Sequence, residues 1–168
     1  TGNSKWDRWK GGQATFTDQE QRGQKLFVTE FDPTGREKGA ECFHCHAEPT
    51  FTNDRYMNNG LDDDATFTDL GRELVTGRPS DRAKFKTPSL RNIAITPPYM
   101  HDGRFTTLEE VIRHYDHGVK RSSTVDPLLQ FSIDPGLGLS EADIADLVAF
   151  LKTLTDESFR TNPAHQAP

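Results

Sequence analysis

The chain has 168 residues, a formal net charge of −6 and only 33% hydrophobic residues. This length suits one domain that buries a core of its own. The acidic balance argues against a nucleic-acid partner, no basic run indicates binding to a membrane surface, and no apolar segment approaches the roughly 18 residues of a transmembrane helix.

The first residues, 1–16, are expected to form an extended lead-in or interdomain linker rather than part of the core. They are polar and rich in glycine, and the two tryptophans, Trp6 and Trp9, suit a neighbouring domain or the domain's own surface equally well. The domain itself is expected over residues 17–159. A polar tail at 160–168 is expected to be disordered.

Two helices are predicted near the ends of this domain. Thr17 and Glu20 have the spacing of a capping box, which predicts a helix to about Val28. Gly23 on its inward face would let a second helix approach closely. The expected partner is the last helix, which Ser140–Asp143 cap. Its apolar residues recur at helical spacing: Ile144, Leu147, Val148, Leu151 and Leu154, with Phe150 on the flank.

The sequence is organised around Cys42-Phe43-His44-Cys45-His46. The spacing C-x-x-C-H is the attachment signature of c-type haem, in which the two thiols Cys42 and Cys45 bond to the porphyrin and His46 is the proximal iron ligand. A zinc site would need a second pair of ligands, and a redox disulfide would leave His46 unexplained. We therefore expect one covalent haem, in a mature or trimmed form of an exported, periplasmic protein, because this attachment normally occurs outside the cytoplasm.

Residues 47–98 are too long for a plain loop. They are rich in Asp, Asn, Gly, Thr and Pro, and we expect turns, one short helix and a small hairpin near Leu74–Thr76 and Lys84–Lys86. Such an insertion needs something to cover, and the haem is the obvious candidate. The acidic run Asp62–Asp64 lacks an EF-hand pattern and is expected to be a solvated turn.

A further helix is predicted over Leu108–His117, capped by Thr106 or Thr107. Tyr115 shares the apolar stripe of this helix and is expected to point into the interior. His114 is expected to point away from the stripe.

The residue opposite His46 decides the chemistry of the iron. A thioether from Met57 or Met100 would raise the reduction potential, an ionised tyrosine would lower it, and an open site would bind peroxide or another small ligand. Tyr115 is the tyrosine on a buried helical face, but a core tyrosine bonded to a carbonyl fits the same pattern. Met100 equally fits a gap-filling role. Spacing alone leaves the choice open.

Several other segments accompany the haem motif in a recognisable order. They are Phe51-Thr52-Asn53, Asp69–Arg72, Phe85–Asn92, Pro98–Gly103 and Thr107–Glu110. Together they resemble the C-terminal haem domain of bacterial di-haem cytochrome c peroxidases and their MauG-like relatives, over most of the chain. The resemblance implies an all-α, cytochrome c-like helical domain around one covalent haem, with a long irregular insertion after the haem motif.

The resemblance also implies iron ligands. In that family the distal ligand lies on the helix after the Pro-Tyr-x-His-x-Gly segment and is Met in the peroxidases and Tyr in the MauG-like enzymes. The matching position is Tyr115, opposite His46, with Met100 as the alternative. The family also holds a calcium through carbonyls at positions matching Thr96 and Pro98, but it adds an Asn from another domain, so the calcium set is incomplete here.

We therefore expect an electron-transfer domain whose partner is a second haem domain or a redox protein, as one half of a larger di-haem protein. One alternative is a monohaem peroxidase or oxidase that acts on hydrogen peroxide and stabilises high-valent iron, although no distal base can be assigned. Another is a haem-based module that binds or senses small ligands. Arg91 and Arg104 are hypothetical haem-propionate partners, and His101 is a hypothetical neighbour of the haem edge; surface charges and a turn histidine fit equally well.

Overall fold

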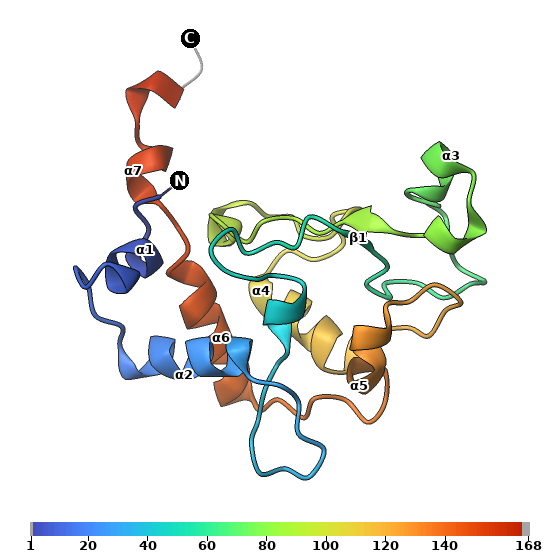
Figure 1. Ribbon diagram of the computed structural model, residues 1–168, viewed down its shortest axis with the longest axis horizontal. Helices are drawn as coiled ribbons and strands as arrows, with labels where there is room; N and C mark the ends of the chain where they lie inside the picture. The colour runs from blue at the N-terminus through green and yellow to red at the C-terminus, as the bar shows by residue number, and fades with distance from the viewer. Residues whose placement is uncertain (1, 166–168) are drawn as a thin grey trace.

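Helices form the frame of the computed structural model, which describes residues 2–165 (Figure 1). The α-helices are α1 (Lys5–Lys10), α2 (Asp18–Val28), α3 (Glu73–Thr76), α4 (Leu108–Arg113), α5 (Gln130–Ile133), α6 (Glu141–Lys152) and α7 (Glu157–Arg160). The short helical turns are η1 (Cys42–His44), η2 (Pro79–Asp81), η3 (Ile93–Ile95), η4 (His114–Gly118), η5 (Pro127–Leu129) and η6 (Pro163–His165). Within the described residues, β1 (Tyr56–Met57) and β2 (Phe85–Lys86) make the one sheet. The predicted all-α class is confirmed.

Helices α2 and α6 cross against one another, as the sequence predicts (Figure 1). The Thr17 side chain accepts from the Glu20 amide and the Glu20 carboxylate accepts from the Thr17 amide, so the capping box that starts α2 is complete. At Gly23 the backbones come so close that a Cβ atom would lie 1.9 Å from the carbonyl oxygen of Asp146. Phe150, expected on the flank of α6, is fully buried in the core.

The beginning of the chain differs from the predicted extended lead-in. Residues 5–10 form α1, and the side chain of Trp6 is only 4% exposed, inside the main core. Trp9 stacks on the buried ring of Phe16, with centroids 4.5 Å apart. The low hydrophobic content of this stretch led to an underestimate of its burial, because two or three aromatic rings bury enough area to hold a polar segment against the core.

Polar contacts explain why α1 forms where the sequence looks unstructured. Ser4 and Asp7 make a reciprocal capping box at its start. The Asp7 carboxylate also forms an ion pair with the guanidinium of Arg91, whose Nη1 lies 2.6 Å away. Arg91 belongs to the insertion after the haem motif, so this ion pair connects the first helix to a segment far along the chain.

The insertion at 47–98 is irregular, as predicted, but its hairpin pairs differently. Strand β2 pairs antiparallel with β1, with Tyr56 opposite Lys86 and Met57 opposite Phe85. The expected partner, Leu74–Thr76, instead lies in the short helix α3 at the far end of the insertion (Figure 1). The β1 segment was missed because it is only two residues long and has no alternation to detect.

The helix predicted over Leu108–His117 is regular only to Arg113. Thr107 and Glu110 form its capping box, and the chain then widens into the π-helical turn η4. Single π turns occur often at functional sites. The wider turn places His114 inside, at 6% exposure, which corrects the expectation that it points away.

The C-terminal end is more regular than the predicted disordered tail. The expected boundary at residue 159 lies inside α7, and Pro163–His165 form the turn η6. Residues 166–168 lie outside the described residues. Of the helices in the described part of the chain, none is both long and apolar enough to cross a membrane.

Candidate haem site

The turn η1 brings the two cysteines and the following histidine into one short loop. Glu41, just before it, has a left-handed backbone with φ of 53°, and the His46 amide donates to the Cys42 carbonyl at 2.9 Å. Both cysteines are free, half-buried thiols. Burial raises the pKa of Cys42 to about 12 and that of Cys45 to about 11, so both are protonated at neutral pH.

His46 is held by a main-chain carbonyl. Its Nδ1 lies 3.0 Å from the carbonyl oxygen of Phe51. Burial lowers the pKa of His46, while the carbonyls of Phe51 and Pro88 act in the opposite direction. If Nδ1 carries the proton of this hydrogen bond, Nε2 is the unprotonated nitrogen, which is the form that binds a metal.

The carbonyl that holds His46 is itself rigidly placed. Phe51 has a φ of 54° and a side chain with no exposed surface. Its ring contacts Trp6 edge-on at 4.9 Å between centroids and lies 5.9 Å from Phe27. The aromatic core therefore fixes the orientation of the proposed proximal ligand.

Tyr115 lies in the turn η4, partly buried. Its hydroxyl oxygen is 3.5 Å from Nδ2 of Asn59. Burial raises the pKa of Tyr115 to about 12, and the hydrogen bond from Asn59 opposes this shift.

Both methionines also lie at the site. The Met100 sulfur is 3.4 Å from the same Asn59 Nδ2, and its backbone has a φ of 72°. The Met57 sulfur is 3.6 Å from the Cys45 sulfur. Met100 is therefore grouped with Tyr115, and Met57 with the haem-attachment motif.

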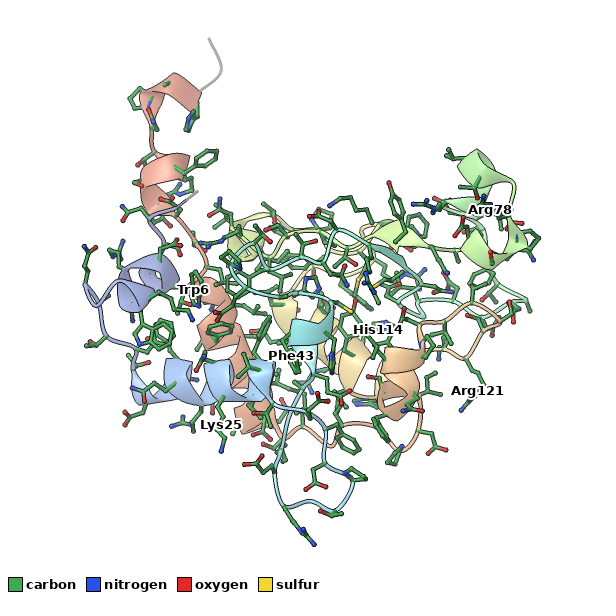
Figure 2. All side chains as sticks on the ribbon, viewed as in Figure 1. Trp6, Lys25, Phe43, Arg78, His114 and Arg121 are labelled. Atoms are coloured by element: carbon green, nitrogen blue, oxygen red, sulfur yellow. The ribbon has the colours of Figure 1, made fainter. Side chains whose placement is uncertain are left out.

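Sequence reasoning missed Asn59 and misjudged His114. The imidazole Nε2 of His114 lies 2.9 Å from the Asn59 carbonyl oxygen, and its ring packs edge-on against Tyr115 at 5.1 Å. Figure 2 shows His114 in the middle of the molecule. The Asn58-Asn59-Gly60 run reads as a turn signal, and nothing in the sequence indicated that this turn meets the helix after Thr107.

The remaining predicted residues have other contacts. Arg91 donates to the Pro49 carbonyl at 2.7 Å and to Asp7, and Arg104 binds Asp62 at 2.8 Å. His101 is exposed and stacks on Phe85, with centroids 3.7 Å apart. Their roles toward a haem therefore stay predictions.

The calcium that the resemblance implies also stays a prediction. Thr96 and Pro98 are exposed and follow the turn η3. Their carbonyls would supply only part of the six to eight oxygen ligands that calcium takes.

The donor set fits a covalent haem. Cys42 and Cys45 offer two free thiols at the required spacing, and His46 offers an imidazole oriented by the Phe51 carbonyl. Tyr115 and Met100 offer an oxygen and a sulfur that share one amide neighbour. A haem c uses two thioether bonds and two axial ligands, and this group of residues contains candidates for all four.

Comparison with known families supports the same assignment. The cytochrome c family matches residues 20–155. The chain is 37% identical over 160 residues to the methylamine utilization protein MauG of Methylorubrum extorquens, covering 94% of this chain and 40% of that protein. It is 32% identical over 160 residues to the cytochrome c551 peroxidase of Nitrosomonas europaea, again covering 94% of this chain and 40% of that protein.

Solved structures agree. A MauG-like protein associated with microbial copper homeostasis has a TM-score of 0.84 at 36% identity, covering all of this chain and 56% of that one. The di-haem peroxidase BthA of Burkholderia thailandensis has a TM-score of 0.69 at 25% identity, covering 99% of this chain and 50% of that one. The resemblance and the cytochrome c-like fold expected from the motifs are both confirmed. The chain spans less than half the length of the curated relatives it matches.

Proposed function

Because the chain belongs to the cytochrome c family, we propose that it is the electron-transfer haem domain of a di-haem peroxidase or MauG-like protein. The family carries covalent haem c, and the relatives support a role in haem electron transfer or peroxidase-type chemistry. The observation that carries the finer proposal is the position of Tyr115. Its phenol oxygen lies 3.5 Å from the Asn59 Nδ2, the same nitrogen that lies 3.4 Å from the sulfur of Met100, the alternative ligand.

The proposed iron ligands are His46 and Tyr115. The haem supplies one-electron oxidation and reduction of its iron. His46 contributes a neutral imidazole whose ring is held by the Phe51 carbonyl at 3.0 Å. Tyr115 would hold the iron through a hard oxygen, releasing its phenol proton to solvent, and the resulting phenolate would favour the oxidised iron. Met100 is the alternative ligand, and its softer sulfur would favour the reduced iron.

A carrier of this kind needs a partner. The relatives are more than twice as long as the region they share with this chain. We propose that the partner is a second haem domain, joined to this one or encoded separately, and that the protein is exported, because haem is normally attached to C-x-x-C-H outside the cytoplasm.

The proposal is tested by Tyr115→Phe in the haem-loaded protein. The variant removes one oxygen and keeps the ring, so the core packing is retained. We expect the ferric optical and electron paramagnetic resonance spectra to change from those of a six-coordinate His/Tyr iron to those of a five-coordinate or water-bound iron. Met100→Leu is the matched control and should leave the ferric spectrum unchanged. Unchanged spectra in Tyr115→Phe would show that another residue is the ligand.

Peroxide separates the carrier from an enzyme. Hydrogen peroxide added to the ferric wild-type domain should neither produce long-lived high-valent iron nor drive turnover of a reducing dye. Sustained turnover by the domain alone would support the monohaem peroxidase instead. Rapid binding of carbon monoxide to the ferrous form would support a ligand-binding module.

A further inference from the structure

Asn59 contacts both side chains considered as distal ligands. Its Nδ2 lies 3.5 Å from the Tyr115 oxygen and 3.4 Å from the Met100 sulfur. The amide group of Asn59 therefore faces both candidates for the second iron ligand, the Tyr115 oxygen and the Met100 sulfur. Asn59 comes from the insertion, whereas Tyr115 comes from the turn after α4.

The backbone on both sides of this carboxamide is tightly held. The Asn59 carbonyl lies 2.9 Å from Nε2 of His114, the residue before Tyr115. Asn58 is buried, and its Oδ1 accepts from the Gly60 amide at 2.9 Å. The Gly60 carbonyl accepts from the Lys120 amide at 2.7 Å. The segment that carries Asn59 is therefore bonded to the chain on both sides of Tyr115, and the two side chains keep one mutual position.

Gly60 shows how closely the two segments approach. Its backbone has a φ of 66°, and a Cβ atom there would lie 2.5 Å from Cγ1 of Val119. Only glycine allows both this conformation and this contact. Asn58 adds hydrogen bonds to Ser122 at 3.1 Å and Thr124 at 3.0 Å. The segment that carries Asn59 is therefore rigid, and a residue that positions a ligand needs such support.

The two acceptors differ in strength. A thioether sulfur is a weak acceptor, whereas an ionised phenol oxygen carries charge and accepts strongly. A hydrogen bond to a charged group changes an equilibrium by a factor of about ten or more. The same N–H therefore stabilises an iron-bound Tyr115 oxygen far more than a neighbouring Met100 sulfur.

We propose that Asn59 is a positioning residue that donates a hydrogen bond to the iron-bound oxygen of Tyr115 and thereby sets the reduction potential of the haem. This inference rests on the proposed His46/Tyr115 ligation. The hydrogen bond withdraws electron density from the phenolate, so the oxygen donates less to ferric iron and the ferrous state becomes easier to reach.

The test uses Asn59→Leu and Asn59→Asp in the haem-loaded protein. The first removes the donor at similar volume, and the second keeps the shape and replaces the donor with a carboxylate. At a fixed solution potential, each variant should raise the ferric-to-ferrous ratio by about tenfold or more, which for one electron corresponds to about 59 mV. The tyrosinate bands in the resonance Raman spectrum should shift in both variants.

Asn53→Leu is the matched control, because the Asn53 Nδ2 lies 3.4 Å from a methionine sulfur, that of Met57. It should change the ferric-to-ferrous ratio by less than about twofold and leave the tyrosinate bands in place, because Met57 is a neutral acceptor. A shift in Asn53→Leu equal to that in Asn59→Leu would show a general loosening and overturn the inference.

Double variants assign the effect to one acceptor. The shift caused by Asn59→Leu should persist in Met100→Leu and vanish in Tyr115→Phe. Persistence in Tyr115→Phe, or no shift in either Asn59 variant, would overturn the role of Asn59 while leaving the ligation intact. If Tyr115→Phe by itself leaves the ferric spectrum unchanged, the proposed ligation has failed, and this outcome is distinct from the others.

Discussion

Hydrogen bonds to main-chain carbonyls hold both imidazoles of the site. His46 Nδ1 is 3.0 Å from the carbonyl of Phe51, and His114 Nε2 is 2.9 Å from that of Asn59. A carbonyl accepts but cannot donate, so each contact requires the proton on the bonded nitrogen. In neutral His46 this leaves Nε2 unprotonated, which is the nitrogen that the proposed iron ligation requires, whereas in His114 it leaves Nδ1 as the acceptor. The two neutral imidazoles therefore keep different nitrogens unprotonated.

A carboxylate far from the haem site shows the same dependence on a few hydrogen bonds. Asp156 is 2% exposed and accepts from the Ser158 hydroxyl at 2.6 Å and from the amides of Phe159, Gly2 and Asn3. The bond from Ser158 and those from the amides hold the pKa of Asp156 well below its ordinary value of 3.8, although burial acts in the opposite direction. The charged form is therefore the one that the folded protein stabilises.

We expect Asp156→Asn to lower the free energy of unfolding at pH 7 by about 1–2 kcal/mol, because the neutral amide accepts more weakly. The folded-state pKa lies below the unfolded value, so the stabilisation is complete above about pH 3.8 and is lost as the pH falls through the folded-state pKa. Urea unfolding of wild type and variant from pH 7 to pH 3 measures the difference, which should narrow below about pH 4.

Glu37→Gln is the charge control, because Glu37 is exposed. It should leave the free energy of unfolding nearly unchanged at every pH. A difference between Asp156→Asn and wild type that stays constant down to pH 3 would contradict the assignment of the charge to Asp156.

At the scale of elements, the crossing of α2 and α6 depends on one glycine. A Cβ atom at Gly23 would lie 1.9 Å from the carbonyl oxygen of Asp146 and 2.9 Å from Cβ of Phe150. The clash is with backbone, which cannot turn aside as a flexible side chain can. The helices would have to separate, and with them the aromatic core around Phe51 that places the carbonyl for His46.

We expect Gly23→Ala to destabilise the haem-loaded domain by about 1–3 kcal/mol, measured by urea unfolding. Gly11→Ala is the matched control, because a Cβ there meets its nearest atom, the Asp7 carbonyl, at an ordinary 3.5 Å. A loss of similar size in both variants would mean that helix crossing is not the cause.

In the whole molecule, one guanidinium joins the first helix to the insertion. Arg91 donates to the Asp7 carboxylate at 2.6 Å and to the Pro49 carbonyl at 2.7 Å, and its guanidinium lies 4.9 Å from the centre of the Trp6 ring. The ion pair is largely shielded from solvent, with side-chain exposures of 14% and 19%. Such a pair is stronger than an exposed one, and breaking it leaves a poorly solvated carboxylate.

We expect Arg91→Gln to release α1 from the core without unfolding the domain. A loss of about 1–2 kcal/mol would raise the population of the detached helix about 5- to 30-fold. Limited digestion with trypsin, followed by mass spectrometry of cleavage after Lys5, Arg8 and Lys10, measures this population. If Arg91 instead acts mainly on a haem propionate, cleavage will be unchanged and the reduction potential will shift.

Local sequence determined the parts of this protein whose partners are close in the chain. The capping box at Thr17 formed as predicted, and of the two caps predicted for the later helix, Thr106 and Thr107, it is Thr107 that forms the box; each box needs only residues three apart. The haem motif at Cys42–His46 is likewise contained in five consecutive residues. The inward position of Gly23 followed from helical periodicity together with the absence of a side chain.

Only the tertiary structure decided the surroundings of Tyr115 and the place of the first helix. Asn59 meets Tyr115 across 56 residues, and Arg91 meets Asp7 across 84. No periodicity encodes such contacts, because they depend on how a long irregular insertion folds over the core. The π turn at His114–Gly118 changed the direction of side chains that an ideal α-helix would have turned elsewhere. Hydrogen bonds between residues a few positions apart can be predicted from the local sequence, whereas contacts between distant segments depend on the packing of the whole chain.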